Sequence, residues 1–155
     1  MQNIVGSSAS ASVLLPAILF IVAIFLAFST GTSWGTFAIL VPIAIAMFPG
    51  TDKLEMMIIS VSAVLAGAVC GDHVSAISDT TVMSSAGAQS NHINHVTTQM
   101  QYAAVVAVVC FIGYIIAGVS QSWWIALGSS LVILLVVLTV MKRVFAAREK
   151  KSVAA

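Results

Sequence analysis

Between Met56 and Met141 this chain carries only two Asp, Glu, Lys or Arg residues, which are Asp72 and Asp79. With 60% hydrophobic and 7% charged residues, it has too little polar surface for a water-soluble globule, which typically carries about 25% charge. The sequence therefore predicts an all-α integral membrane protein whose main partner is membrane lipid. Its net charge of +1 gives no indication of a nucleic-acid partner.

Two apolar segments near the end of the chain are long enough to cross a bilayer. A helix needs about 20 residues to span a hydrocarbon core of roughly 30 Å. Segments 101–119 and 123–140, joined by the polar turn SQS, predict a transmembrane hairpin over 101–140. The bases of KRVFAAREKK in the tail 142–155 predict a cytoplasmic C-terminus of a multi-pass protein in the plasma or inner membrane. The alternative is a solvated tail without topological meaning.

The first apolar region, 13–48, is interrupted by the polar stretch STGTSWGT at 29–36. Neither arm around this stretch reaches about 20 apolar residues. The pattern predicts a re-entrant helical hairpin over 13–48, because irregular backbone at membrane depth needs protein or a water-filled cavity to satisfy it. The alternative is two tilted spans joined by a surface loop. The re-entrant tip includes four candidate hydroxyls: Ser29, Thr30, Thr32 and Ser33.

Residues 54–88 form one apolar stretch whose only interruption is GDHVSAISDT at 71–80. As a single helix this stretch would be roughly 50 Å long, which exceeds the bilayer. The sequence therefore predicts one discontinuous transmembrane helix, with a first half over 54–70, in which glycines loosen the end, and an unwound middle at the bilayer midplane. The second half is predicted from about Thr80 to Ala88, followed by a polar interfacial connection at 89–100.

The two aspartates of this interruption have no neighbouring Lys or Arg. An ionised carboxylate in a bilayer is expensive and normally faces an ion path, so the predicted partner is a transported cation or a proton. Free carbonyls near 69–71 should make Asp72 the proton-exchanging ligand, and a helix N-terminus should keep Asp79 ionised. Both are predicted metal ligands for Na⁺, although an Asp that only caps a buried helix is the alternative. The other candidate ion-binding and proton-exchange residues are His73, Ser75, Ser78 and Thr80.

The remaining polar and small residues indicate little further chemistry. Cys70 and Cys110 lack CxxC spacing and are interpreted as buried small hydrophobes. His92 and His95 resemble a metal pair only loosely, because a third ligand is missing; solvated loop histidines and interfacial pH sensors are the other interpretations. The stretches AVLAGA and SSAGA predict close helix packing. We predict no enzyme and no resident cofactor, only transported Na⁺ and H⁺.

Two stretches, FSTGTSWGTFAILVPIAIAMFP and AGAVCGDHVSAISDTTVMSSAGAQSNHINHVTTQMQYA, closely resemble the C-terminal portion of the NhaC-type Na⁺/H⁺ antiporters of the ion transporter superfamily. The resemblance covers about Val13 to Val140. It implies a secondary active antiporter that exchanges Na⁺ for H⁺ with Asp72, His73, Ser78 and Asp79. It also implies one half of an inverted-repeat transporter, a C-terminal fragment or split subunit that assembles with the missing N-terminal half or a second copy as an oligomer. The alternatives are a Na⁺/H⁺-coupled exchanger of organic acids of the malate or lactate type, and a non-transporting membrane interaction subunit or truncated remnant.

Overall fold

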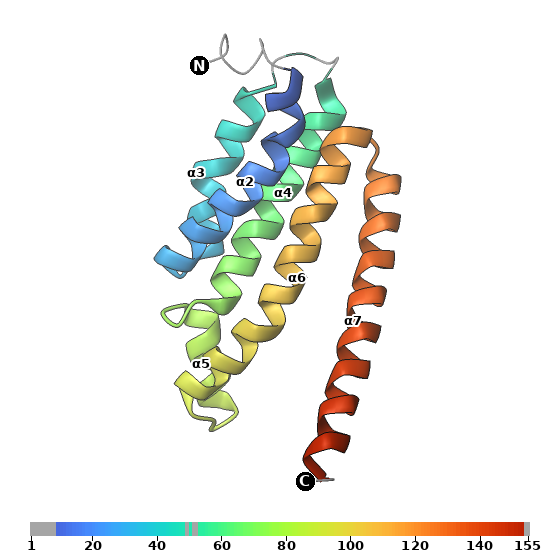
Figure 1. The fold of residues 1–155 in the computed structure, drawn as a ribbon. Coiled ribbons are helices and arrows are strands. Elements are labelled where there is room, and N and C mark those ends of the chain that lie inside the picture. Colours follow the sequence, from blue (N-terminus) through green and yellow to red (C-terminus); the bar gives the residue numbers. More distant parts are fainter. Residues whose placement is uncertain (1–8, 49, 51–52, 154–155) are drawn as a thin grey trace.

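The computed structural model describes residues 9–48, 50 and 53–153 as helices joined by short connections (Figure 1). The elements in chain order are α2 (Ala9–Thr30), α3 (Ser33–Ala46), α4 (Leu54–Val74), α5 (Asp79–Gly87), α6 (His92–Ser120) and α7 (Trp123–Val153). These described residues contain no strand, which confirms the predicted all-helical architecture. Four helices contain a stretch long and apolar enough to cross a membrane: Val13–Thr30, Leu54–Val74, His92–Ser120 and Trp123–Arg143.

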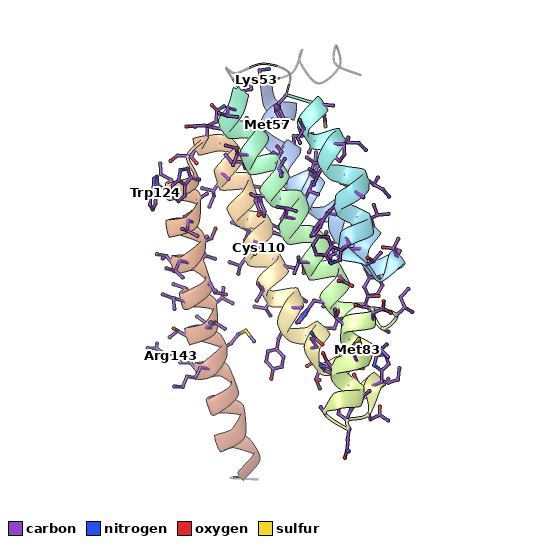
Figure 2. The ribbon with its side chains drawn as sticks, turned by 180° about the vertical axis from the view of Figure 1, so that it is seen from behind. Lys53, Met57, Met83, Cys110, Trp124 and Arg143 are labelled. Atoms are coloured by element: carbon purple, nitrogen blue, oxygen red, sulfur yellow. The ribbon has the colours of Figure 1, made fainter. Side chains whose placement is uncertain are left out.

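The helices run between two ends of an elongated bundle. One end holds the starts of α2 and α4 and the turn between α6 and α7, whereas the α5–α6 connection and the end of α7 lie at the opposite end (Figure 1). Figure 2 shows Lys53 and Trp124 towards the first end and Arg143 towards the second.

Small residues allow α2 and α4 to run side by side in close contact. A side chain at Gly67 would collide with the backbone carbonyl of Phe20. One at Gly71 would collide with the carbonyl of Ile24. Close helix packing through AVLAGA is therefore confirmed, but the expectation that glycines loosen the end of this half is wrong, because both glycines lie inside α4 and admit the α2 backbone. Fully buried alanines complete the contact: Ala23, Ala27, Ala63 and Ala68.

The third helix of this core is α6, which packs on both α2 and α4. The hydroxyl of Tyr114 donates to the carbonyl of Ser62 in α4 at 3.1 Å. Its ring lies 5.2 Å, centroid to centroid, from that of Phe20 in α2. Gly118, also on α6, has no room for a side chain because the backbone of Val13 approaches it. Together these contacts fix the last two turns of α6 against the α2–α4 pair.

The first arm of the 13–48 hairpin is longer than the sequence analysis expected. α2 has 22 residues, about 33 Å. It continues through Ser29 and Thr30 because their hydroxyls donate to carbonyls four residues earlier, each at 2.8 Å, so these polar side chains do not end the helix. The prediction that neither arm reaches a spanning length is therefore wrong for α2, whereas α3, with 14 residues, stays below it.

Residues 89–100, expected as an interfacial connection, are largely helical. α6 begins at His92, and its N-cap residue Asn91 accepts a hydrogen bond from the Asn94 N–H at 3.1 Å. Thr97 donates its hydroxyl back to a carbonyl of the same helix at 2.8 Å. A cap followed by back-bonded side chains satisfies the polar groups of a helix start, so the polar composition of this stretch does not indicate a loop.

The last helix, α7, lies at the edge of the bundle. It packs on α6, where Gly113 lies against Ser130, and none of the residues in its candidate span is buried. Trp123 and Trp124 stack with ring centroids 3.7 Å apart beside the turn from α6. The tail at 142–155, predicted to be cytoplasmic, continues this helix as far as Val153; its side of the membrane stays a prediction.

Candidate functional site

The interruption between α4 and α5, here called the break, covers residues 75–78. Ser75 starts it with an extended backbone, φ −74° and ψ 129°, and its N–H bonds to the Asp72 carbonyl at 3.1 Å. This bond reaches one residue less far back than an α-helical bond, so the Gly71 carbonyl loses its α-helical donor. Ser78 ends the break at the N-cap position of α5, and its hydroxyl pairs with that of Thr80 at 2.8 Å.

The break is shorter and later than the predicted unwound segment 71–80. Gly71, Asp72 and His73 all belong to the last turns of α4, because the helix continues to Val74. The carbonyls of residues 69 and 70 are therefore engaged by helical N–H groups rather than free. The 21 residues of α4 amount to about 31 Å, so the break follows a helix that is itself of spanning length, which argues against the predicted midplane position.

The tip of the α2–α3 hairpin packs against the break (Figure 1). Ser75, which is 1% exposed, donates its hydroxyl to the Phe28 carbonyl at the end of α2 at 2.8 Å. Gly31 turns the chain with φ +67°, and a side chain there would be only 3.0 Å from the Ile77 carbonyl oxygen. Glycine thus suits this turn for both conformation and space. The tip and the break therefore lie against each other in the structure.

The predicted hydroxyls of the tip do not reach into the break. Those of Ser29 and Thr30 are bonded within α2. Thr32 is the N-cap of α3 and accepts from the Gly35 N–H at 3.4 Å, and Ser33 is the first residue of that helix. The tip contacts the break through its backbone rather than through these four side chains.

The two predicted carboxylates have different surroundings. Asp72 is half-buried, and its Oδ1 is buried without a hydrogen-bond partner among the described residues. A buried carboxylate oxygen without a donor is costly and normally has an ion, a proton or a water as its partner. Asp79, in the first turn of α5, is exposed. A helix N-terminus favours negative charge at that position.

His73 belongs to a groove beside the break. This groove, of about 850 Å³, lies between α4 and α6 and is almost entirely apolar. Its lining includes Cys70 and Cys110, which are half-buried there rather than fully buried as expected. The His73 carbonyl accepts a hydrogen bond from the hydroxyl of Thr81 at 3.2 Å. That bond ties the end of α4 directly to α5 across the break.

The sequence analysis missed a polar cluster that adjoins the break from the side of α6. Ser85, only 2% exposed, has its hydroxyl 3.1 Å from Nδ1 of His92 and 2.7 Å from Nδ1 of His95. His92 Nε2 lies 2.8 Å from the carbonyl of Ala76, within the break. The HxxH spacing places both rings on one face of a helix start, which was the available signal. The expected close packing of SSAGA is absent at Gly87, where a side chain would meet open space.

These described residues contain no group of three or more His, Cys, Asp or Glu side chains arranged to hold a metal ion. The chemistry of the site is therefore that of oxygen groups and imidazoles around a helix break. Asp72, the Gly71 carbonyl and the hydroxyls of Ser78 and Thr80 are oxygen donors of the kind that a hard monovalent cation accepts. Breaks between helices, where backbone groups lose their helical partners, are a recurring way of binding ions in secondary transporters.

Comparisons with known proteins place this geometry in a family context. A sequence profile described as the Na⁺/H⁺ antiporter family matches residues 1–119. A protein of Haemophilus influenzae described as uncharacterized is 51% identical over 129 residues, covering 83% of this chain and 25% of that protein. The chain thus spans about a quarter of the length of that relative. No solved structure matches the chain.

Proposed function

The chain belongs to the Na⁺/H⁺ antiporter family, and from this premise we propose that it supplies a cation site at which Na⁺ and H⁺ compete. A membrane transporter, rather than an enzyme, is what the family and the apolar helices indicate. The observation that carries the proposal is the buried Oδ1 of Asp72 beside the break, which has no hydrogen-bond partner in the part of the chain that the structure describes. A carboxylate oxygen in that position is stabilised by either a bound cation or a proton, and exchange requires one group that holds the two in turn.

The other oxygens around the break complete the proposed site. The Gly71 carbonyl lacks its α-helical donor, and the hydroxyls of Ser78 and Thr80 lie 2.8 Å apart at the start of α5. These groups offer neutral oxygen ligands, whereas Asp79 at the N-terminus of α5 adds a second, exposed carboxylate as a ligand or an attracting charge. Ser75 holds the tip to the break, and His73 stands beside Asp72 in the last turn of α4.

We propose that transport requires more protein than this chain. The chain spans about a quarter of its Haemophilus influenzae relative, and its resemblance to NhaC-type antiporters suggests one half of an inverted repeat. A second polypeptide, a longer chain or a second copy would then enclose the break. The bases of the C-terminal tail favour a cytoplasmic location. Because the α5–α6 connection lies at the same end as the tail (Figure 1), the break would open towards the cytoplasm.

The Na⁺ affinity of the assembled transporter across about pH 6 to 9 tests the proposed site. In the native protein, affinity should fall as the pH falls, by up to about tenfold per pH unit when one proton competes with one Na⁺. Asp72→Asn should bind Na⁺ more weakly, and that weaker affinity should no longer change with pH. Asp79→Asn is the matched control, and it should lower the affinity while leaving the pH dependence in place.

Two results would contradict this assignment. One is proton competition that persists in Asp72→Asn, and the other is competition that disappears in Asp79→Asn alone. Transport that requires malate or lactate in addition to Na⁺ would instead favour the organic-acid exchanger. An assembly that binds neither Na⁺ nor organic acid would favour an interaction subunit.

We also propose that the α2–α3 hairpin is re-entrant. Its tip stops beside the break, whereas α5 and the first turns of α6 extend beyond it (Figure 1). In a protein without its native thiols, Thr32→Cys and Thr30→Cys should react slowly with membrane-impermeant thiol reagents, and Na⁺ should slow the reaction further. Ala88→Cys, in the exposed α5–α6 connection, is the control and should react rapidly with or without Na⁺. Tip cysteines that react like the control would mean an ordinary surface loop.

A further inference from the structure

The His92 side chain contacts both the break and the helix that follows it. Its Nε2 lies 2.8 Å from the Ala76 carbonyl, and its Nδ1 lies 3.1 Å from the hydroxyl of Ser85. We propose that His92 is a positioning residue that holds the break in its ion-binding shape, and that its protonation controls how firmly it does so. The role in transport rests on the proposed function, whereas the control of the break does not.

The reason that protonation of His92 matters is the number of hydrogen-bond donors needed around Ser85. The Ser85 hydroxyl lies within hydrogen-bond distance of three groups: the Thr81 carbonyl at 2.8 Å, His92 Nδ1 at 3.1 Å and His95 Nδ1 at 2.7 Å. A hydroxyl has one proton to donate and two lone pairs that accept. If it donates to the carbonyl of Thr81, which can only accept, both histidines must donate to it through their Nδ1–H groups.

His92 then faces an acceptor at each nitrogen. The Ala76 carbonyl needs a proton on Nε2, and the Ser85 hydroxyl needs one on Nδ1, so all four contacts are satisfied together only by the doubly protonated imidazolium. When His92 is neutral, one contact is lost. A neutral ring with its proton on Nδ1 releases the Ala76 carbonyl, and one with its proton on Nε2 makes the Ser85 hydroxyl give up either His92 Nδ1 or the Thr81 carbonyl. Losing the proton therefore removes one hydrogen bond from the network that joins α5, α6 and the break.

The consequence for the site follows from the position of Ala76. It lies between Ser75 and Ser78, both 1% exposed, which border the break. Fixing the Ala76 carbonyl restrains the short loop between the proposed ligands of α4 and those of α5. His95 on the same helix, Asp79 on α5, and Asp72 with His73 at the end of α4 are the titratable groups that the packed elements bring to this region.

Hydrogen exchange of the full chain in lipid, without added Na⁺, measures this directly. The amides of Ser75, Ser78 and Val82 are hydrogen-bonded at or beside the break. After correction for intrinsic exchange rates, their protection should fall by about fivefold between about pH 5.5 and 8, the equivalent of one net hydrogen bond. The matched control is the turn between α6 and α7, where the amides of Gln121 and Ala126 are bonded without a histidine, and protection there should not change with pH.

Variants separate titration of His92 from a merely structural role. His92→Gln keeps a side-chain N–H for the Ala76 carbonyl but cannot titrate, so protection of the break should become independent of pH. His73→Gln, which alters an exposed side chain of α4, should keep the native dependence. Nitrogen NMR of the native protein should show protons on both nitrogens of His92 at the acidic end, a readout that needs no variant to fold.

Three results would overturn the proposal: pH-dependent protection that survives in His92→Gln, native protection that does not change with pH, or a His92 ring with a single proton at the acidic end. These measurements do not involve Na⁺. Their failure therefore leaves the Asp72 site untouched, and a failed Na⁺ titration leaves the His92 connection untouched.

Discussion

The chain holds two helical hairpins, α2–α3 and α6–α7. Their outer helices, α2 and α7, are similarly apolar, but α2 is packed inside the bundle and α7 lies at its edge. The candidate spans in α2 and α7 have nearly the same mean hydropathy, yet 39% of the first is buried and 0% of the second. Lipid tails are as apolar as leucine, so hydropathy cannot distinguish a helix that packs in protein from one that faces lipid. What distinguishes α2 is its alanines and the glycines of α4 opposite them, because only small residues let backbones approach this closely.

The largest effect is expected where this approach is closest. Gly71→Leu would place a side chain against the carbonyl of Ile24, and backbone cannot move aside as a flexible side chain can. We expect the free energy of unfolding to fall by more than about 3 kcal/mol, which is above the usual range for overpacking. Little folded protein should therefore be obtained. Gly128→Leu in α7, where a side chain would meet open space, should fold normally. Yield and thermal stability in mild detergent measure both variants, and comparable behaviour would show that α2 and α4 are not in close contact.

Much of the fold could be predicted from the sequence, because length and apolar composition determine which segments can cross a bilayer. The helical hairpin over 101–140 and the interruption after α4 are both present. The boundaries were harder to predict. Their composition favours a loop for the polar residues at the end of α2 and the start of α6, but their hydroxyls donate to carbonyls of their own helix. A hydropathy profile does not show that these side chains can bond within their own helix.

The candidate site could be predicted in part for the same reason. Asp72 is conspicuous as one of only two carboxylates between Met56 and Met141, and its buried Oδ1 has no hydrogen-bond partner among the described residues. The Ser85 cluster could not be predicted, because its two histidines and its serine come from different helices and meet only through the α5–α6 turn. A single sequence shows which residues share a helix face, but not which face of the next helix lies opposite.

A smaller effect is expected at the bond that joins the tip to the break. Ser75→Ala removes the buried hydroxyl that donates to the Phe28 carbonyl and leaves that carbonyl without its 2.8 Å partner. This should cost about 1–2 kcal/mol of unfolding free energy and raise exchange of the tip amides. Ser84→Ala is the matched control, because its exposed hydroxyl bonds only within α5 and its loss should cost under about 0.5 kcal/mol. Equal costs would mean that the tip and the break are held together by packing alone.

The smallest effect is expected on α7, whose candidate span has no buried residue. Leu135 in α7 is 56% exposed, whereas Leu19 in α2 is 7% exposed. Truncating Leu19 to Ala should cost about 2–5 kcal/mol, because it leaves a cavity between helices, but Leu135→Ala should change the unfolding free energy of this chain by less than about 0.5 kcal/mol, because lipid fills the space. Reversible unfolding in lipid micelles measures both. A cost above about 1 kcal/mol for Leu135→Ala in the chain alone would mean that this side chain packs against protein. If that cost arises only when the chain is assembled with further transporter protein, α7 contacts that protein in the assembly. The difference in burial between α2 and α7 would then hold only for the isolated chain.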